Sequence, residues 1–148
     1  MTAVIQRVIK ASVKINNLED RSITEGLVIL LGVHKDDTEK DIAYLVNKII
    51  DLRIFNDKND KMNCSLLDIH GSALIISQFT LCGDINKGRR PSFLNAADPN
   101  KGKNLYNNFV KLFKARCLNV KTGEFGAHMD INLVNNGPVT FVLDTKNI

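Results

Sequence analysis

The longest apolar stretch of the sequence reads Leu27-Val28-Ile29-Leu30-Leu31-Gly32-Val33. A short, continuous run of this kind, with β-branched residues, is typical of a strand that is buried on both faces of a sheet. Its seven residues are too few to span a bilayer core, because a membrane-spanning helix needs about 20. We therefore expect a central strand of a domain that does not enter a membrane.

The segments on either side of this stretch predict further strands and two helices. Residues 2–9 and 12–15 alternate between two faces, as strands do. After candidate N-cap residues at 36–38, apolar residues recur at helical spacing and predict a helix of about 14 residues. Asp98-Pro99 opens a second helix with an apolar stripe. Further strands are predicted at Ala73–Leu81, 118–122, 130–135 and 139–143, with a long loop at 83–99 that is typical of functional loops.

This order of elements predicts a mixed α/β fold. We expect a β-rich core in a three-layer arrangement of two β-sheets, with two helices packed on one face. The length of 148 residues fits a single domain that spans residues 1–148. Apolar residues make up 44% of the chain and charged residues 24%, which excludes a disordered chain, a collagen and a coiled-coil rod.

The first residues and the cysteines bear on the compartment. The opening Met-Thr-Ala-Val-Ile-Gln-Arg lacks the charged and apolar regions of a signal peptide, so we expect a cytoplasmic protein. Cys64, Cys82 and Cys117 form no CxxC pair. This spacing argues against both a disulfide framework and a zinc knuckle.

Motifs of common catalytic sites are missing. His34, His70 and His128 are isolated in the sequence, without the HExxH spacing of a metalloenzyme. There is no GxSxG elbow, no Walker loop and no GxGxxG motif. We therefore expect neither a metal nor a cofactor, and we infer that the substrate supplies part of the chemistry.

Positive charge is concentrated in the second half of the chain. The net charge is +4, but between Lys87 and Lys121 nine cations accompany one anion, Asp98. Such a cluster attracts a polyanion, whereas the alternative is a solvated face that only keeps the protein soluble. Lys101 and Lys103 lie near the start of the second helix, where cations oppose the helix dipole. This placement favours the polyanion.

Ser77-Gln78-Phe79-Thr80-Leu81 places polar residues at the end of an apolar strand. A buried polar group without a partner costs about 1–3 kcal/mol, so these side chains need hydrogen bonds. They form either an internal network or a cleft whose hydroxyl and N–H groups bind a ligand. The sequence alone leaves both interpretations open.

Asn135-Asn136-Gly137-Pro138-Val139-Thr140 interrupts a predicted strand. Proline cannot donate to a β-ladder and is excluded from central strands. The segment is either a simple turn between two strands or a rigid backbone probe, which a cis peptide bond would suit.

Together the two motifs resemble those of the D-aminoacyl-tRNA deacylase family. Ser77–Leu81 is similar to the family's SQFTL motif, and Asn135–Thr140 is similar to its NxGPVT motif. The resemblance covers nearly the whole chain and includes Val4–Val8, Lys87–Phe93 and Thr122–Met129.

The resemblance implies a homodimer in which the partner completes each active site. It implies that Ser77, Gln78, Phe79 and Thr80 form the catalytic segment, along which the 3′-terminal adenosine of an aminoacylated tRNA lies. Backbone groups there stabilise the tetrahedral oxyanion. In place of a catalytic histidine or carboxylate, the ribose 2′-OH helps to activate water.

The resemblance also implies how chirality is read. Gly137-Pro138, with a cis bond and held by Arg7, projects into the partner's pocket, where an L side chain collides with backbone and a D side chain points outward. Achiral glycine, as on mischarged glycyl-tRNA(Ala), is expected to pass this gate. The substrate pocket is implied to include Met129, Phe125 and Ala127.

The basic cluster then has a partner, because the resemblance implies that Lys87, Arg89, Arg90 and the second helix meet the acceptor-stem phosphates. Three functions stay open. The first is an esterase that cleaves D-aminoacyl-tRNA, a chiral proofreading step of translation. The second is a sister esterase that removes L-alanine or glycine from tRNA, and the third is a non-catalytic binding module. Phe79 favours the first, because the alanyl-specific branch has a differently composed first motif.

Overall fold

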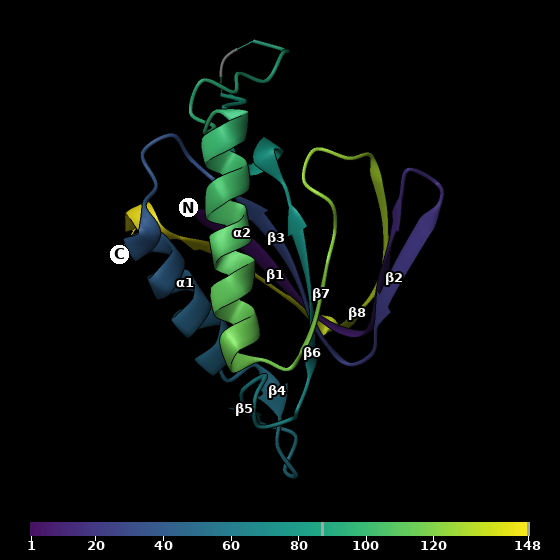
Figure 1. The fold of residues 1–148 in the computed structure, drawn as a ribbon. Helices are drawn as coiled ribbons and strands as arrows, with labels where there is room; N and C mark the ends of the chain where they lie inside the picture. The colour runs from purple at the N-terminus through teal and green to yellow at the C-terminus, as the bar shows by residue number, and fades with distance from the viewer. Residues whose placement is uncertain (87, 148) are drawn as a thin grey trace.

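The apolar stretch at 27–33 contributes the middle strand of a six-stranded sheet in the computed structural model, which describes residues 1–86 and 88–147 (Figure 1). Strand β3 (Gly26–Gly32) pairs with β1 (Thr2–Ile15) in antiparallel and with β6 (Ser72–Ser77) in parallel orientation. The expected central strand is therefore confirmed.

The two faces of β3 enter two different cores, which explains why the stretch is apolar throughout. Ile29 packs into a cluster that includes Phe109 and Phe113 of the second helix. Val28, the preceding residue, packs on the opposite face into a second cluster with Val13 and other strand residues. Because successive side chains of a strand point to opposite faces, both parities have to be apolar here.

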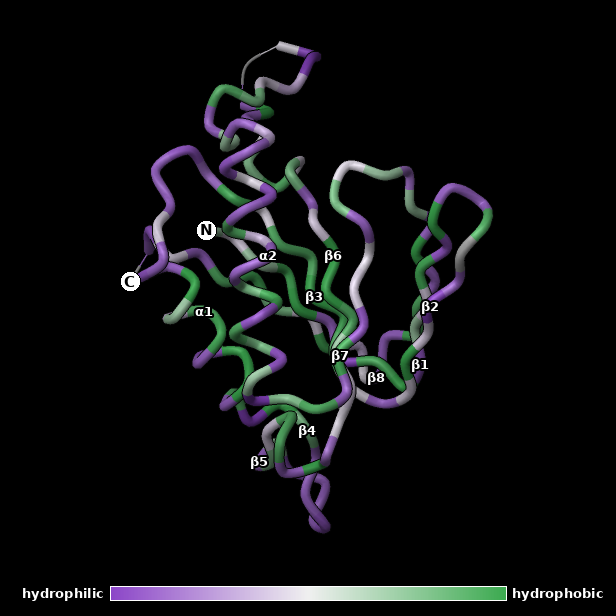
Figure 2. The backbone as a smooth tube through the Cα atoms, viewed as in Figure 1, coloured by the Kyte–Doolittle hydropathy of each residue, from purple (hydrophilic) through white to green (hydrophobic). Residues whose placement is uncertain are grey.

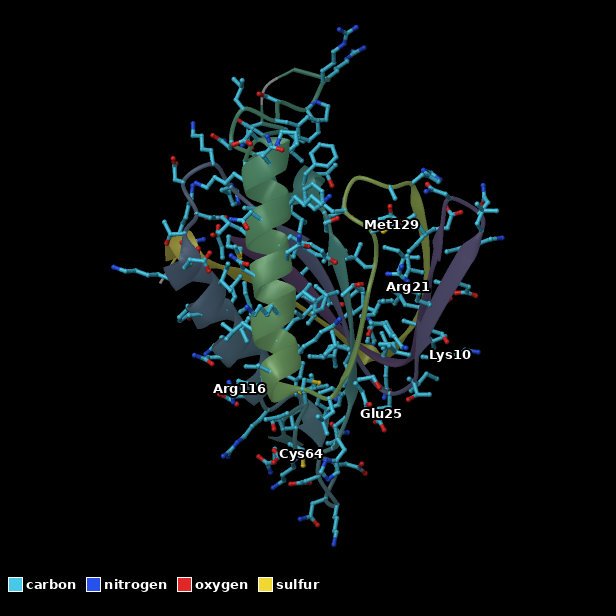
Figure 3. All side chains as sticks on the ribbon, viewed as in Figure 1. Lys10, Arg21, Glu25, Cys64, Arg116 and Met129 are labelled. Carbon is cyan, nitrogen blue, oxygen red and sulfur yellow. The ribbon has the colours of Figure 1, made fainter. Side chains whose placement is uncertain are left out.

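The long strand β1 bends the sheet toward a barrel. Its first half pairs with β3 and its second half, from Ala11 to Ile15, pairs with β2. Its other edge pairs with β8, so the sheet curls until β2 approaches β7 on the far side. There Arg21 donates to the Thr122 carbonyl at 2.8 Å (Figure 3). The remaining strands of this nearly closed sheet are β2 (Glu19–Ile23), β7 (Asn119–Thr122) and β8 (Met129–Asp144).

Both helices cover the same face of the sheet, as expected (Figures 1 and 2). Their buried apolar residues belong to one core cluster with residues of the sheet. Helix α1 (Glu39–Asp51) begins after Thr38, whose N–H donates to the Asp41 carboxylate at 2.8 Å. Helix α2 (Pro99–Arg116) begins after Asp98, whose carboxylate caps the first turn. Within the described residues, no helix combines the length and the apolar character needed to cross a membrane.

Five strand predictions were wrong in their boundaries. Residues 2–9 and 12–15 form the one strand β1, and 130–135 and 139–143 form the one strand β8. The strand predicted at Ala73–Leu81 ends at Ser77, and a 3-10 helix, η1 (Phe79–Cys82), follows. The chain turns at this point because it crosses the end of β3.

Gly32 provides the room for that crossing. A Cβ atom at Gly32 would lie 2.9 Å from Cβ of Leu81 and 3.1 Å from the carbonyl oxygen of Gln78. The loop at 83–99 is also less irregular than predicted, since Asp84 bridges to Ser92. The sequence did not predict the second, two-stranded sheet of β4 (Phe55–Asn56) and β5 (Met62–Cys64), and a short 3-10 helix, η2 (Thr145–Asn147), follows β8.

The mixed α/β class, with two sheets and two helices, agrees with the prediction. The three-layer packing stays a prediction. The cysteines are unpaired thiols, with Cys82 and Cys117 buried and Cys64 half-buried.

Candidate active site

The Ser77–Leu81 motif lies where β6 ends and the chain turns into η1. The Gln78 N–H donates to the Leu31 carbonyl at 2.8 Å, which extends the ladder by one bond beyond Ser77. The Gln78 side-chain amide donates to the Thr80 hydroxyl. The Phe79 side chain remains 59% exposed. The motif thus combines a local hydrogen bond with an open face, so both interpretations of its sequence apply in part.

A pocket of about 520 Å³ opens beside this motif. Its first wall is the end of β6 with Ser77, Gln78 and Phe79, and its second wall is the chain that enters β8. Six predicted site residues line it together: Ser77, Gln78, Phe79, Phe125, Ala127 and Met129. The fourth residue of the predicted catalytic segment, Thr80, follows directly in η1 but is not among the lining residues.

The second wall is held against the sheet by backbone and ring contacts. The Gly123 N–H donates to the Ile75 carbonyl at 3.0 Å. A Cβ atom at Gly123 would lie 2.4 Å from Sδ of Met129, so glycine makes room for the methionine that lines the pocket. The ring of Phe125 contacts that of Tyr106 with 5.9 Å between centroids. The pocket is therefore apolar, with a few polar groups at one wall, as small-ligand sites usually are.

Other lining residues carried no signal in the sequence. Ala96, Ala97 and Pro99 reach the pocket because the loop before α2 folds over the end of the sheet. Small apolar residues in a loop have no pattern that marks them as site residues. Only their tertiary placement identifies them.

Among the described residues that line this pocket, His128 is the one ionisable side chain. Its Nε2 lies 3.6 Å from Oδ1 of Asp130, and the ring is 77% exposed, which places it at the rim. Cys82 ends the neighbouring η1, and burial raises the pKa of its thiol to about 11. A thiol that stays protonated at neutral pH is a poor nucleophile, so Cys82 does not offer one.

The second motif forms a protruding turn within β8. The β1–β8 ladder pairs Gln6 with Thr140 and Val8 with Asn135, so residues 136–139 lie opposite Arg7 alone. The Gly137-Pro138 peptide bond is cis. The amide oxygen of Asn135 accepts the Val139 N–H at 2.8 Å and closes the turn.

Arg7 lies beneath this turn and is hydrogen-bonded to it. It is 7% exposed, and its Nε donates to the Asn136 carbonyl at 3.0 Å. Gly137 has a φ of +128°, and a Cβ there would lie 3.0 Å from Nη2 of Arg7. The turn therefore requires glycine at this position.

The turn and the pocket lie at opposite ends of the sheet. Arg7 pairs with Leu27, and Leu27 pairs with Ala73, near the start of β6. The pocket begins at Ile76, which is about 10 Å further along the strand at 3.3 Å per residue. Figure 1 shows β4 and β5 at one end and the β7–β8 connection at the other. Gly137, Pro138 and Arg7 are absent from the described lining of this pocket.

Some of the basic residues are exposed, and others have partners within the chain. Arg89 and Arg90 are exposed, whereas Lys87 lies outside the described residues. Arg116 forms an ion pair with Asp51 at 2.7 Å (Figure 3).

Lys101 also has a partner within the chain, because its ammonium group donates to the Lys35 carbonyl. Its place near the helix start therefore has a structural reason, and the polyanion partner stays a prediction.

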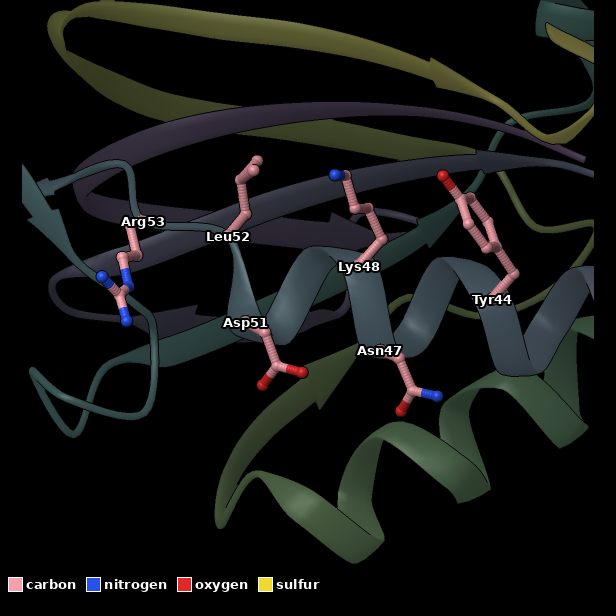
Figure 4. Close-up of a pocket in the computed structure, with 6 residues that line it drawn as sticks. All are labelled: Tyr44, Asn47, Lys48, Asp51, Leu52 and Arg53. Atoms are coloured by element: carbon pink, nitrogen blue, oxygen red, sulfur yellow. The ribbon is translucent and has the colours of Figure 1, made fainter. Parts of the chain in front are cut away.

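A second depression lies on the outer side of α1 (Figure 4). It is lined by Tyr44, Asn47, Lys48, Asp51, Leu52 and Arg53. Asn47 and Asp51 already accept hydrogen bonds from Arg116. Among the described residues, none of the predicted site residues lines this depression.

Comparison with known sequences identifies the family of the chain. The family model for D-Tyr-tRNA(Tyr) deacylase matches residues 4–144. A protein of Thermosipho africanus, named D-aminoacyl-tRNA deacylase, is 57% identical over 148 residues, which cover 100% of this chain and 99% of the relative. A protein of Clostridium botulinum with the same name is 54% identical over 146 residues, which cover 99% of this chain and 98% of the relative.

Solved structures show the same fold. One described as c-Myc DNA Unwinding Element Binding Protein has a TM-score of 0.92 and 37% identity, with 98% of this chain and 99% of that chain covered. Another, described as a probable eukaryotic D-amino acid tRNA deacylase, has a TM-score of 0.84 at 19% identity, with 97% and 99% covered. On the match of the family model and the identity of its relatives, the chain belongs to the D-Tyr-tRNA(Tyr) deacylase family.

Proposed function

We propose that this protein is a hydrolase that cleaves the ester of D-aminoacyl-tRNA to free amino acid and tRNA, with residues 1–148 acting as one catalytic domain. The observation that carries the proposal is the pocket between Ser77–Phe79 and Phe125–Met129 in a member of this family. A 3′-terminal adenosine with its amino acid is a small, partly apolar ligand that suits such a pocket. The reaction serves chiral proofreading during translation in the cytoplasm.

Catalysis is proposed to use groups of the substrate and backbone donors of the motif. Water adds to the ester carbonyl, and the ribose 2′-OH accepts and relays its proton to the departing 3′-oxygen as the C–O bond breaks. N–H groups at the start of a helical turn have no carbonyl partner within that turn. Those of Phe79 and Thr80 are positioned at the start of η1, where they support the oxyanion.

The chirality gate is proposed to come from a second copy of the chain. The turn with Gly137 and Pro138 protrudes at the end of the sheet away from its own pocket, so a homodimer is needed for it to enter one. Exposed apolar side chains on the two paired strands support such an interface: Ile9, Val134, Phe141 and Val142. An L side chain then meets rigid backbone, whereas a D side chain or the hydrogen of glycine does not.

The basic loop is proposed to hold the tRNA. Arg89 and Arg90 are exposed on the segment that precedes Phe93, and the ring of Phe93 contacts that of Phe79 with 5.0 Å between centroids. The loop is thus continuous with the catalytic motif. The exposed side of α2 extends the same positive region toward the acceptor stem, and Lys87, which lies outside the described residues, is proposed to contact tRNA from its place in the sequence.

The test is hydrolysis of matched D- and L-tyrosyl-tRNA, with glycyl-tRNA(Ala) alongside, by the purified protein without added metal. Release from the D and glycyl esters with the L ester spared is expected. Hydrolysis of L-alanyl-tRNA in place of D-tyrosyl-tRNA would identify the sister activity instead. Binding of tRNA without turnover of any ester would leave a binding module.

A further inference from the structure

The small β4–β5 sheet contacts the arginine that supports the gate. Arg7 Nη1 donates to the Ile54 carbonyl at 2.6 Å and to Oδ1 of Asn56 at 3.1 Å. We propose that Asn56 is a positioning residue, which orients Arg7 and through it the Gly137-Pro138 turn, and so tunes the chiral selectivity. This inference rests on the proposed function.

The Gly137-Pro138 turn is held by side chains because the β1–β8 ladder does not include its residues. Residues 136–139 have no partner on β1, since pairing stops at Asn135 and resumes at Thr140. Besides the closing bond from Val139 to Asn135, the bond from Arg7 Nε to the Asn136 carbonyl holds this segment to the sheet. The angle of the guanidinium group therefore sets where the turn points.

Two acceptors on the other side of the guanidinium group fix that angle. The group is planar, so Nη1 and Nε cannot turn independently. Ile54 offers its carbonyl from the chain between α1 and β4, and Asn56 offers a side chain from β4. If Asn56 loses its oxygen, one acceptor remains on Nη1 and the plane is free to tilt.

Asn56 is a good test residue because the position of its backbone does not depend on the hydrogen bond with Arg7. Its side chain is exposed, and its backbone pairs with Met62 in the two-stranded sheet. Asn56→Ala is therefore expected to fold. Asn56→Asp keeps an oxygen acceptor beside Arg7 and serves as the conservative variant.

The experiment measures kcat/KM for D- and L-tyrosyl-tRNA on the dimeric protein and compares their ratio. Asn56→Ala is expected to lower this ratio about three- to tenfold, the effect of one lost hydrogen bond, mainly through faster L-ester cleavage. Asn56→Asp is expected to restore it. The matched control is Asn63→Ala on β5, because Asn63 donates to Asp57 at 2.6 Å and does not contact Arg7.

An unchanged ratio in Asn56→Ala would overturn the proposal, as would an equal fall in Asn63→Ala. If the unsubstituted protein itself fails to cleave the D ester, the proposed function is wrong. If the unsubstituted protein selects the D ester and Asn56→Ala does too, the role of Asn56 alone is wrong.

A second readout does not need turnover. The Nε–H proton of Arg7 is buried and bonded, so its exchange with water is expected to be slow in an NMR spectrum, with the signal assigned by its loss in Arg7→Lys. Asn56→Ala is expected to speed that exchange several-fold, and Asn63→Ala is not. Equal exchange rates of this proton in the unsubstituted protein, Asn56→Ala and Asn63→Ala would refute the proposal that Asn56 orients Arg7.

Discussion

Replacing Thr80 by alanine decides between substrate-assisted water and a threonine nucleophile. In the described part of the chain, the hydroxyl of Thr80 accepts a hydrogen bond from the amide of Gln78, and an amide is not a base. Activated hydroxyl nucleophiles lie within hydrogen-bond reach of a general base. The geometry of Thr80 lacks this activation.

The expected loss of rate in Thr80→Ala follows from its single hydrogen bond with Gln78. Loss of one exposed hydrogen bond costs about 0.5–1.5 kcal/mol, which corresponds to about two- to tenfold in rate. Removal of a true nucleophile from a catalytic constellation costs about a million-fold. The two mechanisms therefore predict results that differ by several orders of magnitude for Thr80→Ala.

The assay is single-turnover deacylation of D-tyrosyl-tRNA with enzyme in excess, for Thr80→Ala and for Thr80→Ser, which keeps the hydroxyl. The melting temperature and the affinity for uncharged tRNA are measured on both variants. A loss beyond about a thousand-fold in Thr80→Ala, with normal melting and binding and with activity retained in Thr80→Ser, would refute the substrate-assisted mechanism.

Three other variants test the basic loop, the rim histidine and the turn. The double variant Arg89→Gln/Arg90→Gln is expected to reduce the slope of log Kd for tRNA against log salt concentration by about 1.4–1.8, since each phosphate contact contributes about 0.7–0.9. An unchanged slope in a filter-binding titration would mean that both side chains are only solvated and do not contact phosphate. His128→Ala is expected to change kcat less than about tenfold, because the ring is 77% exposed at the rim, and a flattened pH–rate profile would instead make this histidine the base. Gly137→Ala is expected to cost about 1–3 kcal/mol of unfolding free energy, because its methyl would lie 2.8 Å from Cγ2 of Val139 at a φ of +128°; an unaltered urea midpoint would contradict this.

The parts of the fold that local patterns encode were predictable. Both faces of β3 are buried, and an unbroken apolar run is the direct signature of that environment. The five apolar residues spaced along α1 are all buried, as their spacing predicts: Ile42, Leu45, Val46, Ile49 and Ile50.

Features that depend on distant segments were not predictable. The end of β6 at Ser77 depends on Gly32, which admits the crossing chain. The continuity of β8 across Gly137-Pro138 depends on a bulge opposite Arg7, whereas proline alone argues for a break. The short β4–β5 pair has too few residues for any periodic signal.

The candidate site likewise has residues that the sequence could predict and residues that it could not. Ser77–Phe79 was predictable because polar residues at the end of an apolar strand need partners or a ligand. Ala97 and Asn56 carry no such signal. The first reaches the pocket through the fold of a loop, and the second meets Arg7 from a position 49 residues away.

The pairing of the first long strand with the last one has a consequence for synthesis. Strand β1 is made before β8, and in the described part of the chain its second edge is covered by residues 129–144. Until the ribosome has passed that segment, the nascent chain carries an open row of N–H and C=O groups that can pair with other chains. A message truncated before residue 129 is therefore expected to give an aggregating product and not a smaller folded protein, which ties the yield of this enzyme to complete translation.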